Sequence, residues 1–157
     1  MSQRDQIRMT EQEVARFLEQ GRTLSVATIN PDGAPHLVAM WYALIDGKIC
    51  MWMYAKSQKA LNLRRDPRIT CMMEAGATYG ELRGVQMRGQ ATLVEEVARV
   101  QAIGEAIYRR SVSADGALTP LQLQIIAAQA PKRIGVVVEP IAIASWDHRK
   151  LGGLSSR

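Results

Sequence analysis

Short strand-like segments separated by tight-turn signals are the feature that most constrains this chain. Asn30-Pro31-Asp32-Gly33 joins a proline that fixes φ to an Asp-Gly pair that tolerates positive φ, and Asp46-Gly47 is a two-residue hairpin signal. Each turn lies between runs rich in β-branched, aromatic and other apolar residues, which is typical of antiparallel hairpins. We therefore predict strands over residues 23–29, 35–45 and 48–55, arranged as a three-stranded antiparallel meander.

Three further strands are expected later in the chain. They are apolar segments over residues 68–74, 82–94 and 133–144, the last interrupted by Pro140. The strands cluster at short intervals, so the sheet is expected to be antiparallel and not a βαβ array. Six hairpin-linked strands predict a closed or nearly closed barrel, because closure removes exposed strand edges. We predict one mainly β domain with flanking helices over residues 1–157.

Helices are predicted where the apolar spacing changes from two residues to three or four. Thr10 and Glu13 form a capping box in front of a helix over residues 11–20. Similar spacing marks residues 95–110, and Thr119-Pro120 is an N-cap followed by proline at the first helical position. Residues 56–66 lose the period of two and are expected to form a short helix that ends at Asp66-Pro67.

Composition narrows the class of protein. The 47% apolar and 22% charged residues are ordinary globular usage, and no apolar run approaches the length of a bilayer. The N-terminus carries no export signal, so a cytoplasmic location is expected. Cys50 and Cys71 lie in apolar runs and are interpreted as small buried hydrophobes, and no cluster has the spacing of a metal site. The same barrel-filling role is expected for the methionines on strands.

The net charge of +5 favours an anionic partner. Phosphate, polyglutamate and nucleic acid all fit that charge. Nucleic acid is the weaker choice, because no recognised RNA-binding or DNA-binding pattern and no aromatic stacking platform is present. A nucleic-acid-binding β-barrel is kept as an alternative that salt-dependent binding to DNA or RNA would reveal.

The segment from Lys56 to Arg68 carries the clearest chemical signal. Ser57 is placed to cap a helix directly after a strand, so the next backbone amides form a ready anion pocket. Lys59 lies in the first helical turn, where the helix dipole disfavours a cation unless an anion is bound. A solvated basic helix would show the same composition. The order of strand, serine and basic turn makes the two interpretations about equally plausible.

Several motifs together resemble the pyridoxamine 5′-phosphate oxidase-like split-barrel superfamily. They are Asn-Pro-Asp-Gly-x-Pro at residues 30–35, the basic turn, Asn-Leu-Arg-Arg-Asp-Pro-Arg at residues 62–68 and Ser-Trp-Asp-x-Arg-Lys at residues 145–150. The resemblance covers nearly the whole chain and is similar to the flavin/deazaflavin oxidoreductase branch. That branch includes proteins that use coenzyme F420. The C-terminal segment is only loosely similar to that of pyridoxamine-phosphate oxidases proper, which argues against oxidation of vitamin B6.

The resemblance implies a six-stranded antiparallel split β-barrel that is active as a homodimer, with the cofactor in a groove between the subunits. It implies a phosphate site at the turn after the third strand and a ring system along the second strand. The partner chain would close the site with a later strand and its C-terminal tail. The implied cofactor-binding residues are Val38, Ala39, Met40, Trp41, Tyr54, Ala55, Lys56, Ser57, Lys59, Gln86, Arg88, Trp146 and Lys150.

The function implied is an oxidoreductase that transfers hydride between reduced F420 and a small planar organic substrate. The cofactor would carry the chemistry, which agrees with the lack of a recognisable catalytic constellation. F420 is favoured over FMN, because arginines can steer its glutamate tail. The alternatives are an FMN-dependent oxidase or reductase of the same superfamily and a non-catalytic flavin- or haem-binding module.

Overall fold

The computed structural model describes residues 2–112 and 115–152, and its centre is one antiparallel sheet of seven strands. The strand order is β2-β1-β5-β6-β7-β4-β3. The strands are β1 (Thr23–Ile29), β2 (Pro35–Trp41), β3 (Ala43–Ile45), β4 (Lys48–Tyr54), β5 (Arg68–Ala75), β6 (Arg83–Val94) and β7 (Arg133–Asp147). Mainly β structure with flanking helices is therefore confirmed, as is the split-barrel class.

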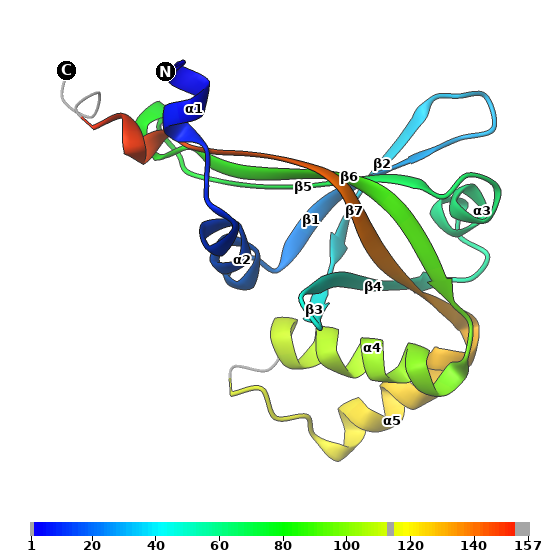
Figure 1. Ribbon diagram of the computed structural model, residues 1–157. Helices are drawn as coiled ribbons and strands as arrows, with labels where there is room; N and C mark the ends of the chain where they lie inside the picture. Colours follow the sequence, from blue (N-terminus) through cyan, green and yellow to red (C-terminus); the bar gives the residue numbers. More distant parts are fainter. Residues whose placement is uncertain (1, 113–114, 153–157) are drawn as a thin grey trace.

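The sheet must curl, because its two edges belong to one continuous segment. β2 lies at one edge and β3 at the other, yet Tyr42 alone separates them in sequence. A flat sheet would hold these edges five strands apart, so the sheet bends round on itself, as Figure 1 shows. The prediction of six strands is wrong, since the single strand expected over residues 35–45 is two strands.

Both hairpins of the predicted meander are present, since β1 pairs with β2 and β3 pairs with β4, but the strand that would join them into one continuous meander is divided at Tyr42. β4 pairs with β3 on one side and with β7 on the other, and β2 pairs with β1. Tyr42 separates the two strands, and Tyr42 and Ala43 are buried in two different hydrophobic clusters, so the chain passes from one sheet edge to the other between the two cores.

Two hydrophobic cores lie on opposite faces of β4. Met51 and Met53 point into the core inside the curled sheet, whereas Cys50 and Trp52 point into a second core. This double burial explains the unbroken apolar run of β4. Buried Met51, Met53 and Met73 confirm the predicted barrel-filling role, whereas the prediction is wrong for Met72, which is half-buried on the other face of β5; both cysteines are free and buried.

Helices cover both cores. The first core is closed by α2 (Glu11–Gln20) and α3 (Gln58–Arg65), and the second by α4 (Val97–Ser111) and α5 (Pro120–Gln129) (Figure 1). Capping boxes at the starts of α2 and α5 confirm the predicted N-caps Thr10 and Thr119. Among the described residues, no helix combines the length and apolarity needed to cross a bilayer.

The last strand is longer than predicted. β7 continues past Pro140 to Asp147 because Pro140 lies opposite Gly89 at a bulge, where the lost amide donor does not interrupt the ladder. A helical turn, η3 (His148–Leu151), follows. It lies beside α1 (Gln3–Ile7), a short helix that the sequence analysis did not predict, so both ends of the described chain meet at one end of the sheet (Figure 1).

Tyr42 holds the joint between the two sheet edges. Its buried hydroxyl donates to the carbonyl of Leu18 at the end of α2. The Arg110 guanidinium lies 4.7 Å from the Tyr42 ring centroid and donates to the carbonyls of Glu19 and Gly21 at 2.9 and 2.7 Å. The joint therefore connects the sheet, α2 and α4.

We expect Tyr42→Phe to lower the free energy of unfolding by about 1–2 kcal/mol, because the Leu18 carbonyl loses its buried hydroxyl partner. Urea denaturation followed by circular dichroism measures the change. Tyr79→Phe is the matched control, since Tyr79 is 58% exposed. Equal stability of the two variants would contradict the role assigned to the Tyr42 hydroxyl.

Candidate functional site

A turn and a helix start follow the end of β4 and form a basic corner, which we call the anion-binding corner for its predicted role and define by Tyr54, Ala55, Lys56, Ser57 and Lys59. The Ser57 amide donates to the Tyr54 carbonyl at 3.0 Å, and Ser57 is the N-cap of α3. Its hydroxyl makes no capping bond and is a buried atom with no hydrogen-bond partner in the described chain. A buried unpaired hydroxyl beside the free amides of a first helical turn is suited to an anion.

Positive charge gathers at this corner without a compensating carboxylate. Burial, and then the nearby charge of Arg133, lower the pKa of the Lys59 ammonium. Lys56 is exposed on the turn. Among the described residues, Lys56, Lys59 and Arg133 have no ion-pair partner. An anion bound here would relieve the repulsion and raise the pKa of Lys59 again.

Arg133 is the first residue of β7 and lies opposite Tyr54 in the register. Its guanidinium lies 4.1 Å from the centroid of the Tyr54 ring and 4.3 Å from that of Trp52. Gln129 accepts from its Nε at 3.0 Å. These contacts hold the cation rigidly at the corner, which reduces the entropy that binding would cost.

The Asn-Leu-Arg-Arg-Asp-Pro-Arg segment holds this corner in place. Asn62 is fully buried, and its amide donates to the Thr28 hydroxyl and the Asn30 side-chain oxygen, both at 3.0 Å. Arg64 donates to the Ala55 carbonyl at 2.6 Å and pairs with Glu95 at 2.8 Å. The segment therefore ties α3 to β1 and fixes the turn from which Ser57 and Lys59 project.

The segment ends in a local ion pair. Asp66 and Arg68 approach to 2.6 Å, and the hydrogen bond from Arg68 lowers the pKa of the Asp66 carboxyl to about 2. Both bonds form between residues two apart, directly at the start of β5. The role of this pair is to stop α3 and begin the strand, and it lies outside the anion-binding corner.

The predicted ring-binding residues Val38, Ala39, Met40 and Trp41 lie on β2, along one lip of a split in the barrel. If the β3–β4 register continued across Tyr42, Ala39 would face Tyr54. Instead β2 pairs with β1 alone, and residues 51–54 of β4 pair with β7 alone, within the described chain. The free edges of β2 and β4 are thus the two lips, and the anion-binding corner is the end of one of them.

Gln86 and Arg88 lie on the outer face of the sheet, in rows that begin on β2. Cross-strand partners share a face, so the registers define these rows. One row is Ala39, Ser25, Met72, Gln86 and Ala144, and the next is Leu37, Ala27, Thr70, Arg88 and Ala142. We call these ten residues the outer face. It is built mostly from small or apolar residues, and Arg88 is its only charged member.

Comparison with known proteins gives the family. A model for pyridoxamine 5′-phosphate oxidase matches residues 10–147. The chain belongs to the pyridoxamine 5′-phosphate oxidase family. A search of curated proteins finds no significant match.

Several solved structures are similar to the structure of this chain. A conserved hypothetical protein from Mycobacterium tuberculosis is 44% identical, with a TM-score of 0.90 over 100% of this chain and 96% of that one. An F420 reductase is 26% identical, with a TM-score of 0.63 over 82% of this chain and 93% of that one. The haem storage protein HutZ from Vibrio cholerae is 16% identical, with a TM-score of 0.64 over 85% and 92%, and shows the shared fold alone.

The remaining predicted residues of this family member lie at the far end of the sheet. Trp146 pairs with Gly84, and a Cβ on Gly84 would lie 2.1 Å from the Trp146 ring, so the indole occupies the space that a side chain at Gly84 would take. Lys150 donates to the Arg8 carbonyl at 2.8 Å and pairs with Glu13 at 2.6 Å. Within one chain, these two residues are therefore separate from the anion-binding corner.

Sequence reasoning missed Arg133 at the corner of this family member. The local signal was the basic pair Lys132-Arg133 directly before an apolar strand. That signal alone does not identify the neighbour of the strand. The pairing of β4 with β7 brings Arg133 to Tyr54, and it joins residues almost 80 positions apart.

We expect Asn62→Ala to lower the free energy of unfolding by about 2–3 kcal/mol, because the Thr28 and Asn30 side chains lose a buried partner. Gln58→Ala is the matched control, since it removes one exposed donor to the Asn62 oxygen (2.9 Å). We expect that control to cost less than about 1 kcal/mol. Thermal or urea unfolding measures both, and a similar loss in the two variants would refute a special role for Asn62.

Proposed function

We infer that this protein is an F420-dependent oxidoreductase that passes hydride between the reduced deazaflavin and a small planar organic substrate. The observation that carries the proposal is the anion-binding corner, in which an unpaired buried hydroxyl lies among cations that have no carboxylate partner in the described chain. Membership of the pyridoxamine 5′-phosphate oxidase family and the likeness to an F420 reductase support it.

The residues of the corner fit the phosphate of such a cofactor. Ser57 would donate its hydroxyl, Lys56 and Lys59 would neutralise charge, and the first amides of α3 would bind the remaining oxygens. Arg133, already fixed between two aromatic rings, would add a further cation. When bound, the deazaflavin supplies hydride transfer, and the chain supplies orientation and electrostatics.

The ring system would lie along the free edge of β2, at Val38, Ala39, Met40 and Trp41. An edge strand presents unpaired backbone donors and acceptors, which can bind the polar rim of a flat heterocycle. Trp41 is 48% exposed on that edge and offers a face for stacking. The site therefore needs no acid or base from a side chain to orient the ring.

The positive net charge of the protein favours F420 over FMN as the cofactor. The formal net charge is +5, and a glutamate tail adds several carboxylates that arginines can bind. FMN presents the same phosphate to the corner but lacks the tail. Direct comparison of the two cofactors decides between them.

The outer face supports a homodimer. Leu37 is 67% exposed there, beside Ala27 on β1, and the same row continues to Ala142 on β7. A broad face with one charge and an exposed leucine is suited to a second copy of the chain. In such a dimer Gln86, Arg88, Trp146 and Lys150 would reach the cofactor of the partner subunit, which explains their distance from the corner of their own chain.

We expect purified protein to quench the fluorescence of F420 more strongly than that of FMN at equal concentrations. Lys59→Ala should weaken binding of the preferred cofactor about tenfold, because a charge-assisted contact to phosphate is lost. Lys48→Ala is the matched control. It removes the same charge at the opposite end of β4, and its affinity should equal that of the wild type.

Two outcomes decide this test. If FMN binds more tightly, FMN replaces F420 as the proposed cofactor, and the phosphate assignment at the anion-binding corner still stands. Unchanged affinity of Lys59→Ala for whichever cofactor binds would remove the phosphate assignment itself.

We expect Leu37→Arg to convert a dimer into a monomer, because the outer face would then bury a second guanidinium, beside that of Arg88, in the interface. Size-exclusion chromatography with light scattering measures the mass. Leu121→Arg is the control, since Leu121 is 65% exposed but lies on α5. A wild-type monomer, or a dimer that survives Leu37→Arg, would count against the interface.

A further inference from the structure

A second cavity lies between α4 and the strands β3, β4, β6 and β7, apart from the anion-binding corner. Its volume is about 400 Å³, within the usual range of small-molecule sites of about 300–1,000 Å³. Its lining includes Asp46 and Lys48 at the start of β4, whereas the corner lies past Tyr54 at the other end of the strand. The two sites therefore share a strand and no lining residue.

The floor of this cavity is apolar. Cys50, Val94 and Ile103 line it and are 3%, 4% and 5% exposed, and Val137 extends the same surface. Burial raises the pKa of the Cys50 thiol, so the sulfur is a neutral part of the floor. A hydrocarbon or aromatic body placed here would leave water without desolvating a charge.

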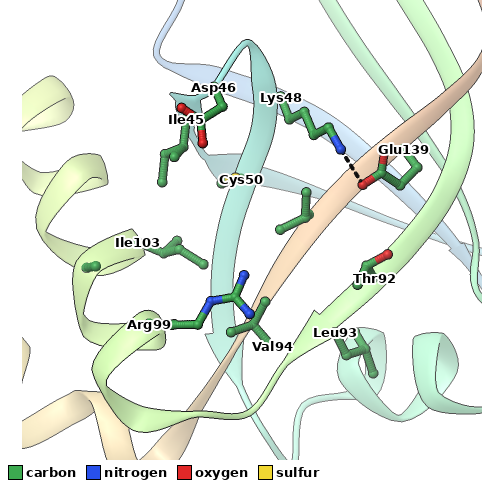
Figure 2. Close-up of a pocket in the computed structure, with 12 residues that line it drawn as sticks. Ile45, Asp46, Lys48, Cys50, Thr92, Leu93, Val94, Arg99, Ile103 and Glu139 are labelled. Carbon is green, nitrogen blue, oxygen red and sulfur yellow. Dashed lines mark hydrogen bonds and ion pairs between the residues drawn. The ribbon is translucent and has the colours of Figure 1, made fainter.

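The charged residues of the cavity lie at its rim, and only some of them form an ion pair. Lys48 and Glu139 pair at 2.8 Å and neutralise each other. Arg99, in the first turn of α4, has no hydrogen-bond or ion-pair partner among residues 2–112 and 115–152. Figure 2 shows its guanidinium reaching from α4 over Val94, with Asp46 at the far end of the cavity.

Arg99 is also opposed by its own helix. The first turn of α4 contains no acidic residue, and the helix dipole disfavours a cation there. An anion bound by the guanidinium would remove that cost and would gain from the same dipole. A ligand that satisfies both the rim and the floor thus joins one anionic group to an apolar body.

We propose that this cavity binds a monocarboxylate with an apolar body, its carboxylate on Arg99 and its body against Cys50, Val94 and Ile103. Asp46 at the far end repels a second carboxylate, so a dicarboxylate of equal length binds more weakly. The site does not depend on the oxidoreductase function, since it shares no residue with the anion-binding corner.

Isothermal titration calorimetry with octanoate tests the proposal. Arg99→Gln should weaken octanoate binding about tenfold, because the charge-assisted contact is lost. Ala102→Phe should abolish binding by filling the cavity, since Ala102 lines it from an exposed position on α4. Suberate, which has eight carbons and two carboxylates, should bind several-fold more weakly than octanoate.

Arg16→Gln is the matched control, because Arg16 is an exposed arginine on α2 that does not line the cavity. Its affinity for octanoate should equal that of the wild type. Cofactor affinity should be unchanged in Arg99→Gln, which separates this result from any failure of the F420 proposal. Absence of octanoate binding, or equal binding by wild type, Arg99→Gln and Ala102→Phe, would overturn the assignment.

Discussion

Burial of Tyr42 is the constraint on which the rest of the structure depends. One residue joins the two edges of a seven-stranded sheet, and its hydroxyl and ring connect that joint to α2 and Arg110. Because the joint is fixed, β2 and the second half of β4 diverge from a common point. The split between them, with the anion-binding corner at its end, is thus a result of how the barrel closes.

Local signals predicted most elements. The capping residues Thr10 and Thr119 and the Asp46-Gly47 turn act within a few residues, so the sequence shows them directly. Both predicted hairpins are present, but the continuous meander prediction failed at Tyr42 because the pairing of β4 with β7 is decided at long range. Nothing near residue 42 indicates that β4 prefers β7 to β2, and burial of two adjacent residues is a property of the packed cores.

In the candidate site, too, some residues are predicted from local sequence signals and others are brought together only by long-range pairing. Ser57 and Lys59 were predicted from a serine and a basic turn after a strand, which are neighbours in sequence. Arg133 required the β4–β7 register, and the common face of Ala39 and Gln86 required four strands in order. Asn62 was noticed as part of a motif, but its bonds to Thr28 and Asn30 became visible only in the folded chain.

The contact of Trp146 with Gly84 has a consequence for how this family member can vary. The indole occupies the space that a side chain at Gly84 would take, and even one methyl group at that position would overlap the ring. The orientation of the largest side chain near the C-terminus is therefore set by the smallest residue of β6. A side chain at position 84 would therefore require Trp146 to move or to be replaced by a smaller residue.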